Sequence, residues 1–132
     1  NANLNHASVQ RSKLWRANLE GAELKETKLQ NSDLSEANLT NAYLRSTHFN
    51  GAKLLKACLQ GANVKGANFM NADLREADLQ GIQNIEQAKF NKYTILPDAK
   101  YKGSDKHGQP IYDKYWSPKV DWSQYIDHKV TT

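Results

Sequence analysis

The chain has 132 residues, a formal net charge of +4 and one cysteine, which is the length of about one domain. A single cysteine excludes an intrachain disulfide and a cysteine-based zinc site. The longest hydrophobic run is three residues, as at 57–59, whereas a membrane crossing requires about 20, so membrane insertion is excluded. Mean hydropathy is low at −0.80, but 24% charged residues with a small net charge lack the self-repulsion typical of disorder.

A period of five residues runs through the first 81 positions. Every fifth residue from Leu4 to Leu79 is large and apolar, and the residue two places before each of these is Ala, Ser or Thr. This period fits neither an α-helix, with 3.6 residues per turn, nor a strand with strict alternation. It predicts a coil with flat sides, in which the large residue fills the axis and the small residue lies where space is tight.

Several of these units resemble a known family. Ala-Asn-Leu-Glu-Gly at 17–21 and Ala-Asp-Leu-Arg-Glu at 72–76 are similar to the A-[DN]-L-x-x units of pentapeptide-repeat proteins, and the match extends over 2–81. The resemblance implies an all-β fold, a right-handed quadrilateral parallel β-helix of about four regular coils. Residues 84–97 resemble a shortened form of the family's terminal segment, which implies an irregular last coil.

With four units per coil, residues twenty apart stack on successive rungs. The first side then carries three like charges in succession, Lys25, Arg45 and Lys65, which we call the basic column. It is either a solvated stripe or a surface for an acidic partner. The third side instead alternates in sign, with one column of Lys13, Asp33, Lys53 and Asp73 and another of Arg16, Glu36, Lys56 and Glu76. We expect these two columns to neutralise themselves.

Trp15 and Leu55 share an outward column on the third side. Isolated exposed apolar residues need no explanation, but tryptophan is enriched at interface hot spots. Two interpretations stay open: the C-terminal segment covers Trp15, or Trp15 meets another chain.

Residues 98–132 differ in character from the repeats. They hold six of the twelve aromatic residues, among them Tyr112, Trp116 and Trp122, interleaved with charges. We predict a division into a β-helix over 1–97 and a cap or docking tail over 98–132, because the last coil of a solenoid exposes its core and an unpaired edge. Tyr112, Trp116 and Trp122 are the candidate cap or docking residues.

Catalytic signatures are missing from the sequence. It contains no G-x-x-x-x-G-K phosphate loop and no H-E-x-x-H motif, and the outward carboxylates belong to flat sides. His6 and His48 lie two coils apart, about 10 Å, which one metal ion cannot bridge. We therefore expect no enzyme activity, no cofactor and no metal.

Three functional classes remain. The first is a protein–protein interaction module that binds an unknown protein through the basic column, Trp15 and Leu55. The second follows from the resemblance: some family members mimic DNA and bind topoisomerases such as gyrase, but residues 1–83 hold ten basic against eight acidic residues, which disfavours mimicry. The third is weak nucleic-acid binding through the basic column. A homodimer through an uncapped coil end or the tail is a further possibility. We favour the cytoplasm, with the periplasm or thylakoid lumen as alternatives if Asn1 is a processed terminus.

Overall fold

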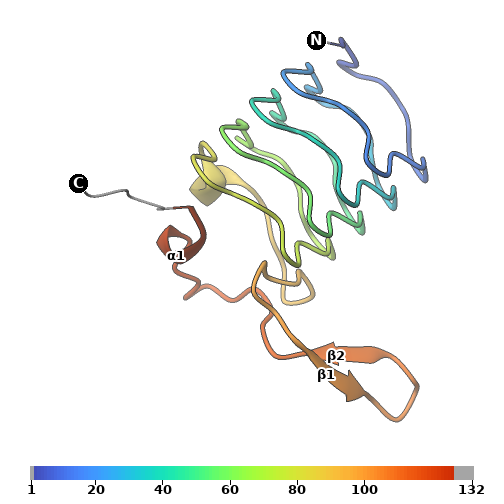
Figure 1. Cartoon of the computed structure of the whole chain (residues 1–132), viewed down its shortest axis with the longest axis vertical. Coiled ribbons are helices and arrows are strands. Elements are labelled where there is room, and N and C mark those ends of the chain that lie inside the picture. The colour runs from blue at the N-terminus through green and yellow to red at the C-terminus, as the bar shows by residue number, and fades with distance from the viewer. Residues whose placement is uncertain (1, 127–132) are drawn as a thin grey trace.

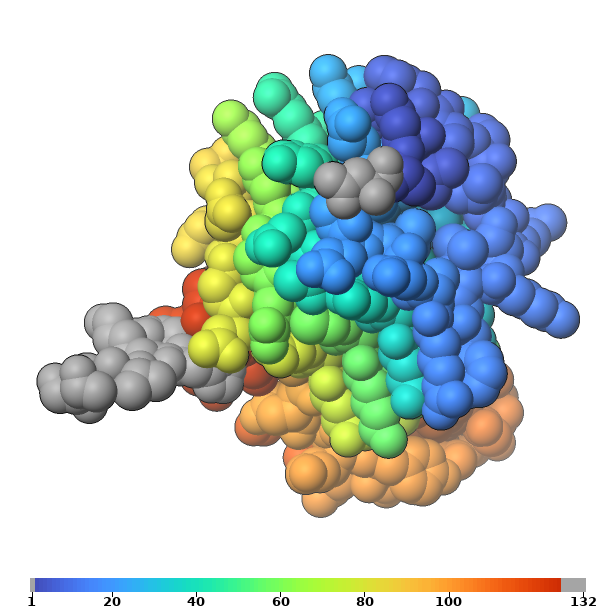
Figure 2. Space-filling view, turned by 45° about the horizontal axis from the view of Figure 1, so that its top comes forward, coloured from blue at the N-terminus to red at the C-terminus, as the bar shows by residue number. Residues whose placement is uncertain are grey.

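The computed structural model describes residues 2–126, which wind into coils of twenty residues stacked along one axis (Figure 1). Single-residue parallel bridges join residues twenty apart, beginning with Asn3 to Glu23 and continuing to Asn63 with Gln83. Successive coils form parallel ridges on the surface, from the first coil in blue to the last in yellow (Figure 2). Residues 127–132 of the predicted tail lie outside the described part of the chain.

The five-residue period defines the interior, as the sequence predicts. The large inward residues from Leu24 to Leu79 are at most 2% exposed, and the small residues two places earlier are buried beside them. Where that small residue is polar, its hydroxyl bonds to the preceding coil: Thr27 donates to the Leu4 carbonyl at 2.7 Å and Thr47 to that of Leu24 at 2.6 Å. Ser and Thr replace Ala here without leaving a buried donor unsatisfied.

Each five-residue unit ends in a tight turn. The residue two places after the inward one has a φ between +55° and +72° at every corner from His6 to Gly81. The next amide closes the turn, as when Ala7 N–H donates to the Leu4 carbonyl at 3.0 Å, so the corners are type II turns. The left-handed conformation costs roughly 1 kcal/mol for a non-glycine residue. It is offset because the corner N–H donates to the next coil, as from His6 to Lys25 at 2.8 Å.

The Asn or Asp that precedes the inward residue supports the turn from outside. Its side-chain oxygen accepts the backbone N–H two residues ahead, at 3.0 Å from Asn38 to Thr40 and at 3.1 Å from Asp73 to Arg75. A short side chain with an acceptor oxygen makes this bond readily. The preference for Asn or Asp at this position is therefore a local structural requirement.

Glycine is favoured at the corner occupied by Gly61. Its φ is +68°, and a Cβ added there would collide with the side-chain oxygen of Asn41, one coil below. We expect Gly61→Ala to lower the free energy of unfolding by about 1–2 kcal/mol, measured by urea denaturation. The double variant with Asn41→Ala should recover the part due to the collision and keep the backbone strain. A Gly61→Ala chain as stable as the parent would contradict this account.

The coil loses its regular register after residue 83. Asn84 enters the left-handed region at a φ of 65°, and a short 3-10 helix, η1 (Ile85–Gln87), follows. The parallel bridges continue, but Asn68 now pairs with Lys89 and Asp73 with Ile95, so the spacing grows from twenty to twenty-one and then twenty-two residues. These irregular pairings over 84–97 agree with the expected terminal coil.

A column of aromatic rings runs from the interior into the C-terminal segment. Phe49 stacks on Phe69 with ring centroids 5.0 Å apart, and Phe69 stacks on Phe90 at 5.5 Å. Beyond Phe90 lie two rings from the tail, Trp122 at 4.7 Å and Trp116 at 6.2 Å. Residues far apart in sequence thus form one continuous stack.

The tail has three short elements. Strands β1 (Tyr101–Ser104) and β2 (Pro110–Tyr112) form an antiparallel hairpin that projects from the last coil, and α1 (Ser123–Ile126) lies beside that coil (Figure 1). Within the described residues 2–126, no helix has the length and apolar character that crossing a membrane requires.

Backbone pairing and a polar cluster fasten the tail to the last coil. Trp116 N–H donates to the Thr94 carbonyl at 2.9 Å, next to an antiparallel bridge between Ile95 and Tyr115. Asp98 forms an ion pair with Lys114 and accepts the Tyr125 hydroxyl at 2.6 Å. Burial alone would raise the pKa of Asp98, but these two hydrogen bonds outweigh it and hold the pKa below its usual value.

Candidate functional site

The basic column lies on the outer surface of the coils, as its spacing predicts. Lys25, Arg45 and Lys65 are all exposed, on three successive rungs. None of them makes an ion pair within the described part of the chain. A hollow of about 230 Å³ beside Lys25 and Arg45 is also lined by Glu23 and the 58%-exposed Tyr43. The structure therefore offers cations with an aromatic ring next to them.

In the column of Lys13, Asp33, Lys53 and Asp73 on the third side, the opposite charges lie on neighbouring rungs but form no ion pair with one another among the described residues. Asp33 accepts the Ser35 N–H at 3.0 Å, and the hydrogen bonds from Ser35 lower the pKa of Asp33, with a smaller contribution from Lys53. Asp73 forms a bidentate pair with Arg75, two residues along the chain. These aspartates bond to their own turns, because that acceptor geometry is built into each unit.

The neighbouring column forms one ion pair between rungs. Arg16 Nε lies 3.5 Å from Glu36 Oε2, and the two side chains are 63% and 37% exposed. Such exposed pairs contribute at most about 1 kcal/mol. The lysines of the third side, Lys13, Lys53 and Lys56, have no ion pair among residues 2–126.

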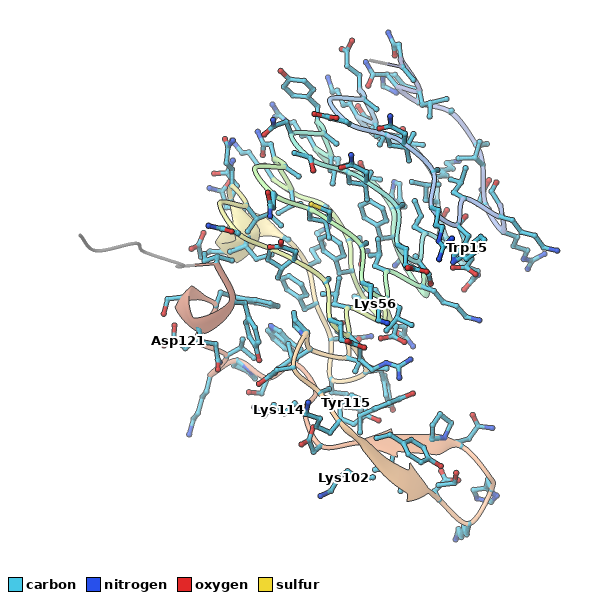
Figure 3. All side chains as sticks on the ribbon, viewed as in Figure 1. Trp15, Lys56, Lys102, Lys114, Tyr115 and Asp121 are labelled. Atoms are coloured by element: carbon cyan, nitrogen blue, oxygen red, sulfur yellow. The ribbon has the colours of Figure 1, made fainter. Side chains whose placement is uncertain are left out.

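Trp15 stands on the first coil with its side chain held at two points. Its Nε1–H donates to Glu36 Oε2 at 3.2 Å, and the Arg16 guanidinium lies 4.3 Å from the ring centroid. Trp15 nevertheless remains 55% exposed, while Leu55 is half-buried in the same column. Figure 3 places Trp15 at the end of the coil opposite Lys114, Tyr115 and Asp121. The described part of the tail therefore does not cover Trp15, and that interpretation is wrong for these residues.

The three candidate tail aromatics fall into two places. Trp116 and Trp122 lie against Phe90 at the end of the core. Tyr112 lies instead at the base of the hairpin, where the Arg75 guanidinium is 4.4 Å from its ring centroid. The hairpin also carries Tyr101, 61% exposed, and Ile111, 40% exposed.

Sequence reasoning missed the residues that attach the tail. Asp98, Arg75 and Tyr125 each contact a residue distant in sequence, and no motif marks them. The inward position of Phe90 can be predicted from the sequence, because Phe90 keeps the five-residue step after the one-residue slip at Asn84.

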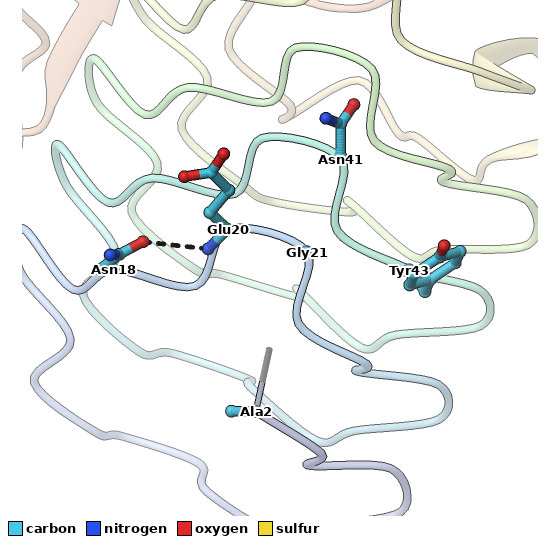
Figure 4. Close-up of a pocket in the computed structure, with 6 residues that line it drawn as sticks. All are labelled: Ala2, Asn18, Glu20, Gly21, Asn41 and Tyr43. Carbon is cyan, nitrogen blue, oxygen red and sulfur yellow. Dashed lines mark hydrogen bonds between the residues drawn. The ribbon is translucent and has the colours of Figure 1, made fainter.

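A polar hollow of about 450 Å³ lies across the first three coils (Figure 4). Asn18, Glu20, Asn41 and Tyr43 line it, and Asn18 Oδ1 accepts the Glu20 N–H at 3.2 Å. Its one acidic residue faces no histidine or cysteine in the lining. Across the described residues, no three His, Cys, Asp or Glu side chains gather closely enough to hold a metal ion.

Comparison with protein-family models gives one match. The model described as pentapeptide repeats, eight copies, matches residues 2–41, 28–66 and 59–83. A search of curated proteins found no match.

Solved structures with the same repeat are similar to this chain. A pentapeptide-repeat protein from the cyanobacterium Cyanothece 51142 is 31% identical, with a TM-score of 0.69 over 71% of this chain and 63% of that one. HetL from Nostoc sp. strain PCC 7120, involved in heterocyst differentiation regulation, is 33% identical, with a TM-score of 0.41 over 74% and 52%. A protein of the Arabidopsis thaliana thylakoid lumen is 28% identical, with a TM-score of 0.40 over 61% and 60%. The chain thus spans between 52% and 63% of the length of these relatives.

Proposed function

The chain belongs to the pentapeptide-repeat family, and from this membership we propose that it is a non-catalytic module that binds a protein partner through one rigid face of its coil. The observation that supports this most is the basic column, whose three exposed cations stand on successive rungs without an ion pair among the described residues. Stacked like charges are mildly unfavourable. A negatively charged partner surface would relieve that cost.

The finer description of the fold is part of the same proposal. We take the coil to be the right-handed quadrilateral β-helix that the relatives imply, over 1–97, and residues 98–132 to be its C-terminal cap. The stacking of Trp116 and Trp122 on Phe90, and the pairing of Trp116 with Thr94, support the cap over a free docking arm.

The triple variant Lys25→Ser, Arg45→Ser and Lys65→Ser tests the binding face. We expect its melting temperature to change by no more than about 2 °C, because exposed substitutions usually shift stability by less than about 0.5 kcal/mol. Capture of partners by the tagged chain from its native cell extract should fall roughly tenfold or more, since rim and central charges both contribute to association. Affinity purification with quantitative mass spectrometry measures this loss.

A matched control removes the same charge without touching the column. Lys56, Lys89 and Lys102 are exposed and scattered over the coil and hairpin, so their replacement by serine should leave capture intact. Equal capture by the parent and the column variant would remove the basic column from the binding face.

Two other functions have less support. Gyrase modulation by DNA mimicry requires a continuous acidic surface, whereas the repeat region has ten basic and eight acidic residues. Nucleic-acid binding through three cations would neutralise only about three phosphates and would be weak and strongly salt-dependent. A supercoiling assay tests gyrase modulation, and binding of a labelled duplex tests nucleic-acid binding.

A second copy of the chain is a third candidate partner, and the oligomeric state in solution tests it.

A further inference from the structure

A groove of about 710 Å³ crosses the first three coils beside Trp15. It lies on the corner and near edge of the third side, so it is separate from the basic column on the first side. Besides Trp15, its lining residues are the cations Arg11, Lys13 and Lys53, the polar residues Ser12 and Asn31, and the carboxylate Asp33. Its volume is in the range that holds a ligand or several side chains of a partner.

The charge of the groove is unbalanced. Arg11, Lys13 and Lys53 are exposed and form no ion pair within residues 2–126. The one acid, Asp33, is half-buried and already accepts the Ser35 N–H at 3.0 Å. The groove thus holds three cations against one carboxylate that keeps its negative charge and interacts with Lys53, which leaves an excess of positive charge for negative groups that enter it.

The indole of Trp15 is fixed before any partner arrives. The hydrogen bond to Glu36 at 3.2 Å and the Arg16 guanidinium at 4.3 Å hold the ring, yet more than half of the residue is exposed. An aromatic side chain that two contacts already orient loses less conformational entropy on binding than a free one. Tryptophan also offers a large apolar area and is enriched at interface hot spots.

We propose that this groove binds an acidic segment of a partner protein, with an apolar or aromatic side chain packed on Trp15 and carboxylates on Arg11, Lys13 and Lys53. The inference rests on the proposed function, because it names the partner chemistry for the Trp15 part of the binding face. A single-stranded nucleic acid fits less well. The groove offers one aromatic ring, where sites for single-stranded nucleic acid use several.

Three labelled probes test the proposal by fluorescence anisotropy with the full chain. They are a short peptide in which glutamates flank phenylalanines, its charge-reversed copy with lysine for each glutamate, and an oligothymidine. We expect the acidic peptide to bind and the copy not to bind. Trp15→Ala, and separately the triple variant Arg11→Ser, Lys13→Ser and Lys53→Ser, should each weaken the acidic peptide by roughly tenfold.

The variant in which Lys56, Lys89 and Lys102 are replaced by serine is the control for this experiment, because it removes the same charge and none of its residues lines the groove. It should bind the acidic peptide within about twofold of the parent at physiological salt, because charges outside the groove are screened over about 8 Å. The proposal is overturned if the parent does not bind the acidic peptide, if the groove variants bind it as well as the parent, or if oligothymidine binds more tightly through the same residues. If the groove proposal is overturned in this way but the basic-column variant still loses partner capture, the proposed function stands.

Discussion

Replacing Phe69 with alanine is expected to lower the free energy of unfolding by about 3–5 kcal/mol, the usual cost of emptying a buried phenylalanine site. Phe69 is 1% exposed and is the middle ring between Phe49 and Phe90, nearly parallel to both. The variant therefore loses burial on both sides and breaks the aromatic column between the regular coils and the tail. Urea denaturation followed by circular dichroism measures the loss.

Phe69→Leu is the matched control for this prediction. Leucine fills the equivalent inward position in most units, so the coil accepts its shape. We expect a cost of about 1–1.5 kcal/mol, since volume and apolar character are largely retained. If alanine and leucine cost the same, ring stacking and cavity formation at Phe69 do not hold the core together.

Replacing Trp116 and Trp122 together by alanine should have an effect of similar size, about 3–5 kcal/mol, and should also change the oligomeric state. Both rings lie on Phe90, so the variant leaves the end of the core open to solvent. Exposed apolar surface and unpaired edges promote association. Thermal denaturation and size-exclusion chromatography with light scattering measure the two effects.

Trp15→Ala is the control for this prediction, because it shows how much stability is lost when a tryptophan outside the cap is removed. Trp15 is exposed and lies in the first coil, so its removal should cost less than about 1 kcal/mol. A Trp116 and Trp122 double variant that melts with the parent and keeps the same oligomeric state would refute the cap.

The interior of the coil could be predicted from the sequence because every five-residue unit packs in the same way. Each unit places one large and one small residue inside, so sixteen copies of one pattern report the same packing. The stack of Phe49 on Phe69 followed directly, since residues twenty apart share a column. The exposed positions of Trp15 and the basic column follow from the same register.

Contacts of the outward side chains and of the tail could not be predicted from the sequence. The alternating charges of Lys13, Asp33, Lys53 and Asp73 suggested ion pairs between rungs, but the backbone amide two residues ahead lies closer to each aspartate than a flexible lysine does. The attachment of the tail depends on single pairs such as Arg75 with Tyr112, which occur once and therefore leave no period to read.

Because each coil has twenty residues and a corner every five, the position of a residue in the sequence determines which side of the coil it lies on. A gain or loss of twenty residues would restore every column to its place, whereas a gain or loss of five would keep the core pattern and turn all later sides by a quarter of the circumference. The two extra residues that the structure does contain lie after position 83, where η1 and the following loop absorb them. Trp15 and Arg75 lie three rungs apart, and the number of residues between them determines the direction in which Trp15 faces relative to Arg75. The relative placement of the groove beside Trp15 and of the hairpin therefore depends on keeping that number of residues.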